Sequence, residues 1–515
     1  MSKLVEFKDL IDKDYTFKGE SFILGAPILE GEIVRDAYIR VPLKTLNRHG
    51  LIAGATGTGK TKTLQVIAEA LSDASVSVLM LDIKGDLSGL AAAGIANDKI
   101  KERYHDLNLE YIPKSFPVEL MSISEEKGVR MRATVTEFGP ILLSKILQLN
   151  DTQGGLLSLI FKYCDDRQLP LVDLKDLIKL LQYIGDQGKI EIEKEYGKIS
   201  TTSTGTILRK IIELQQQGAD LFFGETSFEV DDLMRINDKG QGMISIIRVT
   251  DLQSKPKLFS TFLLQLLAEL YATCPEEGDL DKPKLVLFID EAHLIFQEAS
   301  TALLQQIETI IKLIRSKGIG IFFCTQNPTD VPSAILGQLG LKIQHALRAF
   351  TAKDRKDIKS MAQNFPSSSF YKVDELLTQM GMGEALVSLL NEKGMPTNLA
   401  YTRLCSPRSR MDILSESEID ALLDKSKLVG KYKENIDSES AFEILSQKIE
   451  NAGYAQNKAE NDTQRKAETR PQKQEKSALE EILNSSIAKQ MGRTASSILV
   501  RSFMGALGLT GKNKR

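Results

Sequence analysis

The sequence predicts an α/β protein built on a parallel sheet, and three observations lead to this prediction. A short apolar run at 51–53 passes through a glycine-rich turn into an amphipathic helix. The segments 76–83 and 285–289 are almost entirely apolar, as is typical of strands covered on both faces. Strands and helices alternate from about 243 to 326, which favours parallel strands joined by right-handed crossovers.

The length of the chain indicates more than one lobe. Its 515 residues exceed what one hydrophobic core normally supports, so we expect two or three lobes. Residues 1–45 are predicted to form a short extended N-terminal segment, because SFILGAPI and AYIRVPL alternate loosely in the manner of strands. Residues 46–100 would then hold the first part of the core and residues 241–425 the second part.

Residues 101–240 are predicted to be a mostly helical insertion into that core. VELMSI and VRMRATV look like strands, whereas the later stretches ILLSKILQL, LLSLIFKYC, LKDLIKLLQYI and TILRKIIELQQQ have helical periodicity. The core resumes with the strand GMISIIRV, the helix FSTFLLQLLAELYATC and the strand LVLFI. A helix, TALLQQIETIIKLIRSKG, and a strand, GIGIFFCT, follow.

The end of the chain changes in composition. Residues 430–476 contain AQNKAENDTQRKAETRPQKQEK, which is nearly devoid of apolar side chains and predicts a disordered linker. Residues 477–510 regain helical periodicity, and from Lys489 onward the chain has six basic residues and no acid. We expect an amphipathic basic helix here. It could dock on the core, join subunits, contact DNA or lie peripherally on an anionic membrane.

Composition excludes several classes of protein. The formal net charge of −3 gives no global positive field, so any nucleic acid would need a local basic patch or pore. Four scattered cysteines without a C-x-x-C pair are typical of buried thiols in a reducing compartment. The N-terminus lacks the apolar stretch of a signal peptide, and no run of about 18 apolar residues could span a membrane. The expected location is the cytoplasm.

The glycine-rich turn carries the strongest functional signal in the chain. It matches G-x-x-x-x-G-K-[ST], a loop whose backbone N–H groups cradle phosphates at the N-terminus of a helix. Lys60 is expected to reach the β- and γ-phosphates of ATP, and the Thr61 hydroxyl to bind Mg²⁺. The predicted nucleotide-binding residues are Gly54, Ala55, Thr56, Gly57, Thr58, Gly59, Lys60, Thr61 and Lys62.

Polar residues at the ends of two predicted strands complete a hydrolysis site. Asp290 follows the strand 285–289 at its carboxyl end, where open α/β sheets bind ligands, and is expected to hold Mg²⁺. Glu291 is expected to polarise the attacking water. Gln326 ends the next strand and is predicted to contact the γ-phosphate or its water. Asp82, Lys84 and Asp86 lie near the same edge, with either active-site support or turn formation as their role.

Arg315 is a candidate for a second kind of role. It lies at a predicted helix end just before the strand that leads to Gln326, where an arginine could enter a neighbouring subunit's site. Such an arginine stabilises the charge of a phosphoryl-transfer transition state. A plain cation at a helix C-terminus is the alternative interpretation.

The chain resembles the HerA/FtsK superfamily of hexameric ATPases. More specifically, it resembles the helicase HerA-like C-terminal domain family, in the branch typified by the bacterial YjgR proteins. The similar strings are RHGLIAGATGTGKTKTLQ, LMLDIKGDLSGLA, LVLFIDEAHLIF and RSKGIGIFFCTQNPTDVP, and the resemblance covers roughly residues 20–425.

This resemblance implies a RecA-like core and a homo-oligomeric ring. It implies that Arg315 acts in trans, that Gln326 senses the nucleotide, and that Arg48 also touches nucleotide. Two functions follow as hypotheses: an ATP-driven motor that moves or processes DNA, and an ATP-dependent switch or scaffold that acts on protein partners without DNA translocation.

Overall fold

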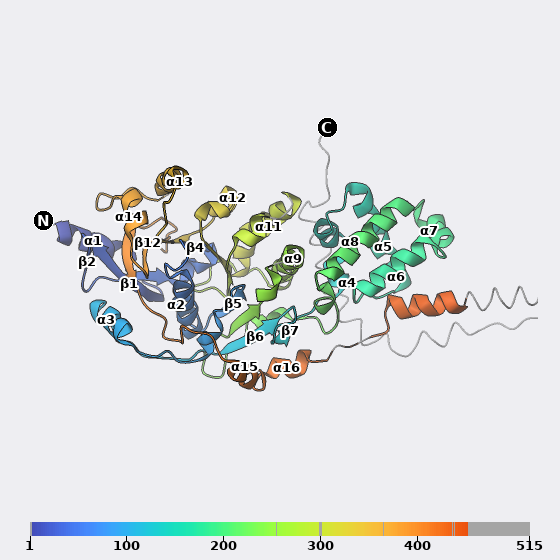
Figure 1. The fold of residues 1–515 in the computed structure, drawn as a ribbon, viewed down its shortest axis with the longest axis horizontal. Helices are drawn as coiled ribbons and strands as arrows, with labels where there is room; N and C mark the ends of the chain where they lie inside the picture. The colour runs from blue at the N-terminus through green and yellow to red at the C-terminus, as the bar shows by residue number, and fades with distance from the viewer. Residues whose placement is uncertain are drawn as a thin grey trace, which may run out of the picture. The chain divides into compact units, whose positions relative to one another are not determined.

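A large sheet dominates the computed structural model, which describes residues 3–253, 255–297, 301–363, 365–434, 436 and 438–451. The chain divides into two compact units. The sheet unit comprises Met1–Met131, Phe228–Ser260 and Cys274–Lys433. The helical unit comprises Arg132–Ser227, Thr261–Thr273 and the chain from Glu434 onward. Figure 1 shows the ribbon of both units.

The sheet has 13 strands within the described residues, in the order β2-β1-β13-β12-β11-β4-β10-β9-β5-β8-β6-β7, with β3 paired to β1. From β11 to β7 neighbouring strands are parallel, and from β11 to β2 they are antiparallel. The predicted α/β class with a mostly parallel sheet is therefore confirmed. The strands are β1 (Ser21–Leu29), β2 (Glu32–Ile33), β3 (Ile39–Pro42), β4 (Gly50–Ala53), β5 (Ser77–Asp82), β6 (Val118–Ser122), β7 (Val129–Arg130), β8 (Ile244–Arg248), β9 (Leu285–Ile289), β10 (Ile319–Thr325), β11 (Leu341–His345), β12 (Glu384–Ser388) and β13 (Ala400–Leu404).

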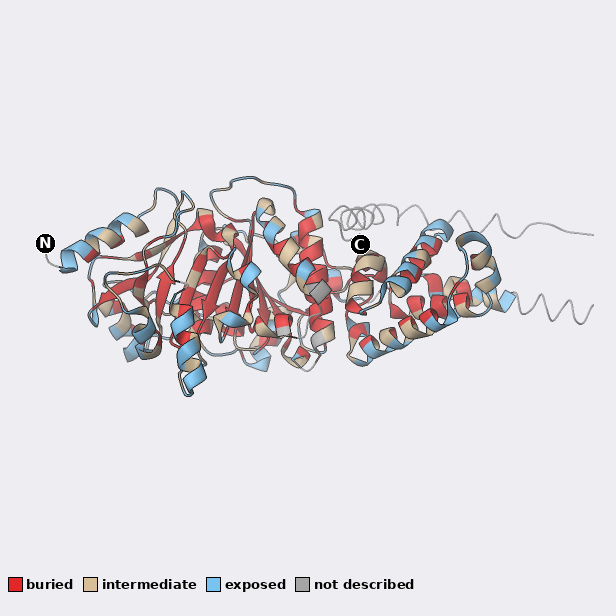
Figure 2. Cartoon of the chain, turned by 90° about the horizontal axis from the view of Figure 1, so that it is seen from above, coloured by how far each residue is buried: buried red, intermediate tan, exposed pale blue. Residues whose placement is uncertain are grey.

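Helices cover the sheet, and the central strands are buried along their whole length (Figure 2). The apolar face of α2 that the sequence predicted is fully buried, since Leu64, Ile67, Ala68 and Leu71 are each at most 1% exposed. The helices of the sheet unit are α1 (Lys3–Tyr15), α2 (Lys60–Asp73), α3 (Asp98–Asp106), α10 (His293–Gln297), α11 (Thr301–Ile314), α12 (Ser333–Leu336), α13 (Ala352–Ala362), α14 (Val373–Gln379), α15 (Glu416–Leu423) and α16 (Lys427–Tyr432), while α9 (Pro256–Thr273) begins in the sheet unit and ends in the helical unit.

The N-terminal segment differs from the extended structure predicted for residues 1–45. β1, β2 and β3 lie there, but α1 precedes them. Its narrow apolar stripe, Phe7, Ile11 and Tyr15, recurs every fourth residue and is fully buried. The Tyr15 hydroxyl also donates to the backbone oxygen of Asn398 at 2.6 Å. Leu4 and Val5 lie outside this stripe and are exposed, so the helical period is weak in the sequence.

The stretch of the helical unit that interrupts the core, Arg132–Ser227, is shorter than the predicted insertion at 101–240. β6 and β7, which the sequence places inside that insertion, belong to the large sheet because β6 pairs with β8 in parallel. Such pairing joins segments more than a hundred residues apart, and local periodicity does not reveal it. The helices between Met131 and Phe228 are α4 (Val135–Ile146), α5 (Asp151–Arg167), α6 (Leu174–Gly185), α7 (Lys189–Tyr196) and α8 (Thr201–Gln216).

The predicted linker at 430–476 also differs where the structure describes it. Residues 441–451 are helical, and Ala441 and Leu445 are buried one turn apart in the helical unit. Residues 452–515, which include the rest of that linker and the predicted basic helix at 477–510, lie outside the described residues. Within the described residues no helix is long and apolar enough to cross a membrane.

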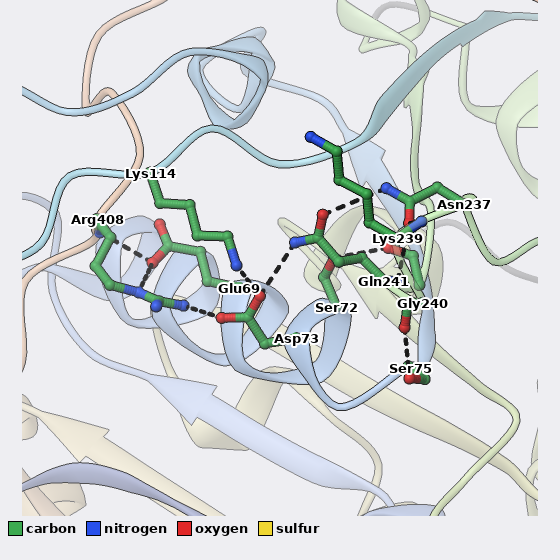
Figure 3. A network of polar contacts seen from close by, with 11 residues as sticks. Glu69, Ser72, Asp73, Ser75, Lys114, Asn237, Lys239, Gly240, Gln241 and Arg408 are labelled. Atoms are coloured by element: carbon green, nitrogen blue, oxygen red, sulfur yellow. Dashed lines mark hydrogen bonds and ion pairs between the residues drawn. The ribbon is translucent and has the colours of Figure 1, made fainter.

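A polar network fixes the C-terminal end of α2 (Figure 3). Asp73 ion-pairs with Lys114 and Arg408 and accepts a hydrogen bond from Gln241 at 3.1 Å. Glu69, which is 2% exposed, accepts the backbone N–H groups of residues 408 and 409 at 2.9 and 3.0 Å. A cavity of about 620 Å³ opens beside these residues, at the other end of α2 from the glycine-rich loop. Three separate segments thus hold the helix whose first turn follows that loop.

Candidate active site

The loop between β4 and α2 is a strained turn that only glycine fits well. Gly54 has φ +152, and a Cβ there would lie 2.5 Å from the Cβ of His345. Gly59 has φ +111 and directly precedes Lys60, the first residue of α2. Because L side chains rarely adopt such angles, the glycines let the backbone curl immediately before the helix. The N-terminus of α2 therefore faces the concave side of a tight loop, as an oxyanion site requires.

Two other segments brace this loop. The Ala55 N–H donates to the backbone oxygen of Ala346 at 2.8 Å, just after β11, and the Gly383 N–H donates to the Thr58 oxygen at 3.0 Å. Arg103 in turn donates to the Gly383 oxygen at 3.1 Å. Ala346 and Gly383 lie 291 and 325 residues from their partners in the loop, Ala55 and Thr58, and the sequence carries no motif that singles them out.

His345 lies behind the loop and is fully buried. Its Nε2 is 3.0 Å from the Thr63 hydroxyl, on the first turns of α2. Burial, and to a smaller extent the Lys60 ammonium, lowers the pKa of His345 to about 3, so the ring is neutral near pH 7. A strand that ends in a histidine next to the loop was the only available signal, and sequence reasoning did not use it.

Lys60 is buried within the loop itself. Its Nζ donates to the backbone oxygens of Gly54 at 2.6 Å and Ala55 at 3.1 Å. Burial is the main factor that lowers its pKa, followed by the charge of Lys84, while the two acids Asp290 and Glu291 oppose the shift. The Lys60 ammonium therefore lies within electrostatic range of Lys84, Asp290 and Glu291.

The remaining predicted residues of the loop divide into two groups. Thr56 and Gly57 are exposed at the tip of the loop, and Thr61 is half-buried on the first turn of α2. Lys62 points elsewhere, because its Nζ donates to the backbone oxygen of Met411. Asp86 and Asp412 are the nearest acids that act on its charge. The structure thus separates Lys62 from the concave face of the loop.

Asp290 and Glu291 emerge beside this loop. They follow β9, which lies in parallel between β5 and β10, and β10 in turn pairs with β4. Asp290 is 4% and Glu291 5% exposed. Burial raises the pKa of Asp290 to about 6, against the opposing effect of Lys84, whose Nζ is 3.7 Å from Asp290 Oδ2. Two acids, two lysines and the loop therefore meet at the carboxyl edge of the sheet.

Glu291 has an unusual conformation and environment. Its φ of +46 is the left-handed region, which a non-glycine residue adopts at some cost and which recurs at functional sites. It forms an ion pair with Lys84, and His293 Nδ1 lies 3.0 Å from its Oε2. Apart from these contacts and that of Lys84 with Asp290, neither Glu291 oxygen nor Asp290 Oδ2 has a hydrogen-bond partner among the described residues, although all three are buried. Buried acceptors in this state fit a cation or a polarised water.

Gln326 lies at the same edge as the acids. It is exposed and directly follows β10, between β4 and β9. The loop starts beside it, because the Gly54 N–H donates to the backbone oxygen of Thr325 at 3.2 Å. The structure therefore brings Gln326 next to the glycine-rich loop.

Arg315 and Arg48 lie at the opposite edge of the sheet. Arg315 precedes β10 and Arg48 precedes β4, so each sits at the amino end of a strand whose carboxyl end faces the loop. A strand of four residues separates the edges by roughly 13 Å. Burial, and then the charge of Arg315, lowers the pKa of Arg48. Neither is part of the phosphate cradle of its own chain.

The chain is similar to several known proteins. A family model described as helicase HerA-like C-terminal matches residues 29–515. The chain belongs to this family. The resemblance found in its sequence is thereby confirmed. The DNA double-strand break repair helicase HerA of Sulfurisphaera tokodaii is 23% identical over 355 residues, which cover 68% of this chain and 64% of that protein. The HerA helicase of Sulfolobus acidocaldarius is 20% identical over 357 residues, with the same coverages.

This family member therefore spans less than two thirds of the length of those relatives. Among solved structures, the bacterial conjugative coupling protein TrwB, in a trigonal form with sulphate, has a TM-score of 0.51 at 14% identity. The match covers 79% of this chain and 94% of TrwB. An unbound monoclinic form of TrwB gives 0.50 at 13% identity, with the same coverages. At this identity the likeness concerns the fold, and it is the P-loop ATPase fold that the sequence predicted.

Proposed function

We propose that this protein hydrolyses ATP with Mg²⁺ at the edge of the sheet where the glycine-rich loop meets Asp290 and Glu291. The loop and the N-terminus of α2 would bind the phosphates, and Lys60 would leave the loop oxygens for the β- and γ-phosphates. Thr61 and Asp290 would hold the magnesium ion. Mg²⁺ usually takes one or two protein ligands together with phosphates, which suits a site with few ligands of its own.

One structural observation supports this proposal in addition to the glycine-rich motif. Asp290 and Glu291 are adjacent buried carboxylates that contact Lys84 and His293, and their charges also act on Lys60. Adjacent buried carboxylates are costly, and function is a common reason to retain them. Bound Mg²⁺ would supply neutralising charge for the phosphates. Glu291 would polarise the attacking water, and Gln326 would contact the γ-phosphate or that water.

We also propose a homo-oligomeric ring in which each chain completes its neighbour's site. Arg315 and Arg48 are two guanidinium groups at the amino edge of the sheet, a strand's length away from their own chain's loop. A pair of like charges gains most from an anion, and a nucleotide held by the next subunit is such an anion. Arg315 would then act in trans on the γ-phosphate, with Arg48 beside it.

The most direct test of the site compares two variants. Lys60→Ala should abolish ATP binding, because the loop loses the cation that faces the phosphates. Glu291→Gln should still bind ATP while turnover collapses. Binding is measured with a fluorescent ATP analogue and turnover by phosphate release. Normal turnover by Glu291→Gln would remove that residue from its proposed role.

ATP hydrolysis by this protein would drive the translocation or processing of DNA. The matched relatives are named as DNA repair helicases, and in this family member the net charge of −3 means that DNA would be held locally. Purified protein at low salt should then bind duplex or single-stranded DNA and turn over ATP faster with it. Absence of both effects would exclude the motor.

The second candidate is an ATP-dependent switch or scaffold that acts on protein partners. The helical unit favours it, because α4–α8 form a separate compact body without strands of the large sheet. This function predicts turnover that DNA does not change and a protein partner retained only with ATP. Mass measurement in solution with and without ATP, followed by turnover with and without DNA, separates the two functions.

A further inference from the structure

Lys84 stands out because it contacts both acids of the site from a different strand. It follows β5, whose Leu81 pairs with Ile289 of β9, so the two strand ends run side by side. Its Nζ ion-pairs with Glu291 and lies 3.7 Å from Asp290 Oδ2. The lysine side chain is 35% exposed, whereas the two acids are about 5% exposed. Lys84 thus enters a buried pair of carboxylates from the solvent side.

The turn that carries Lys84 is held rigidly. The Asp82 carboxylate accepts the backbone N–H groups of Gly85 at 2.7 Å and of residues 86 and 87 at 3.2 Å. Gly85 has φ +76, an angle suited to glycine, and Gln253 donates to the Ile83 oxygen at 2.7 Å. The rigid turn fixes the backbone position of Lys84. Less backbone conformational entropy is therefore lost when the Lys84 side chain forms its ion pairs.

The negative charges of Asp290 and Glu291 require a nearby positive charge such as that of Lys84. Two adjacent carboxylates are buried, and among the described residues the polar side chains in contact with their oxygens are Lys84 and His293. Lys60 is occupied by the oxygens of Gly54 and Ala55. Burying two like charges without a counter-charge is strongly unfavourable. Lys84 is therefore the principal positive charge that the pair contacts directly.

We propose that Lys84 is an internal counter-cation and positioning residue for the Asp290–Glu291 pair: it holds Glu291 in place and stops free Mg²⁺ from binding the acids alone. Mg²⁺ would then enter only as Mg–ATP, whose arrival moves Lys84 off Asp290 while its ion pair with Glu291 persists. This inference deepens the proposed ATPase function, on which its kinetic consequence rests. Its consequence for free metal ions rests on the charges alone.

The first experiment measures free Mg²⁺ without nucleotide. In Lys84→Met, which keeps the length of the side chain but removes its charge, Mg²⁺ at millimolar concentration should raise the melting temperature by about 2 °C. The unaltered protein and Lys84→Arg should show no such shift. The double variant Lys84→Met/Asp290→Asn should lose it. Ca²⁺ and Na⁺ at matched ionic strength report general salt effects.

Lys127→Met is the matched control. Lys127 also contacts two acids, Glu416 at 3.1 Å and Asp420 at 2.7 Å, but all three side chains are at the surface. Its loss should leave the response to Mg²⁺ unchanged. If Lys84→Met does not fold, Lys84→Gln replaces it. A Lys84 variant that folds and does not respond to free Mg²⁺ would overturn the counter-cation role, whatever its ATPase activity.

The second experiment separates positioning from the general ATPase proposal. Lys84→Met should lower kcat by roughly 10- to 100-fold with little change in KM, because a displaced Glu291 no longer aligns the water. Lys84→Arg should recover most of the loss. In the Glu291→Gln background, Lys84→Met should have little further effect. Unchanged kcat in Lys84→Met alongside the expected collapse in Glu291→Gln would reject the positioning role and leave the ATPase proposal standing.

Discussion

His345 Nε2 lies 3.0 Å from the Thr63 hydroxyl, directly behind the loop that carries Lys60. The contact joins the end of β11 to the first turns of α2, and a Cβ on Gly54 would collide with the same histidine. Both partners are buried, so water cannot replace the hydrogen bond. The shape of the phosphate-binding loop thus depends on a side chain 285 residues away from Lys60.

Replacing His345 should therefore weaken nucleotide binding. In His345→Ala the Thr63 hydroxyl loses its partner and a cavity opens behind Gly54, which costs about 1–3 kcal/mol. We expect affinity for the ATP analogue to fall by about tenfold, with the protein still folded. His105→Ala is the control, because His105 is 81% exposed on α3. Equal affinity in both variants would show that the loop holds its shape without His345.

The same histidine predicts a pH dependence of stability. Its folded-state pKa of about 3 lies below the ordinary value of 6.5, so below pH 6.5 the unfolded chain binds a proton that the folded chain does not. Its contribution to stability is complete above pH 6.5 and is lost as the pH falls toward 3, by up to about 1.4 kcal/mol per unit. The melting-temperature advantage of the natural protein over His345→Asn should shrink between pH 7.5 and pH 5.

Glu291→Gln should reduce turnover by about 10²- to 10⁴-fold, the usual contribution of a positioned general base. The shape of the side chain is retained, so ATP binding should stay within about threefold. Quenched-flow phosphate release and equilibrium binding measure the two quantities. A parallel loss of binding would mean that the carboxylate supports the fold of the site and not the chemical step.

Arg315→Ala should lower turnover only in assembled protein. Arg315 precedes β10 at the edge of the sheet opposite the loop, so we expect it to act on the nucleotide of a neighbouring chain. Mixed with Glu291→Gln, it should restore part of the activity, because some interfaces then combine an intact arginine with an intact acid. Arg410→Ala, at a surface pair with Glu418, is the control. No recovery in the mixture would argue against action in trans.

The network at the end of α2 predicts a loss of stability. Arg408→Ala removes the ion pairs of the arginine with Asp73 and Glu69. The Arg408 side chain is 30% exposed, so solvent screens these ion pairs in part. We expect the free energy of unfolding to fall by about 1–2 kcal/mol after allowance for solvent screening. Thermal denaturation measures the change, again with Arg410→Ala as the control. A shift no larger than the control's would make the network a surface feature.

Sequence alone determined the parts of this protein that are local in the chain. The glycines, Lys60 and Thr61 are contiguous, and the apolar runs that end in Asp290 and Gln326 carry their own period, so strand, loop and helix could be inferred there. The family followed from the same strings. Gly54 and Gly59 must be glycine for backbone reasons that a short motif records.

Tertiary structure decided what depends on pairing between distant segments. The order of strands put β10 between β4 and β9, which brought Gln326 to the loop and sent Arg48 and Arg315 to the other edge. It turned Lys62 toward Met411, set Lys84 on the acid pair and placed His345 behind Gly54. Side-chain periodicity says which face of a strand is buried but not which strand lies beside it, because hydrogen-bonded partners are chosen by the packing of the whole sheet.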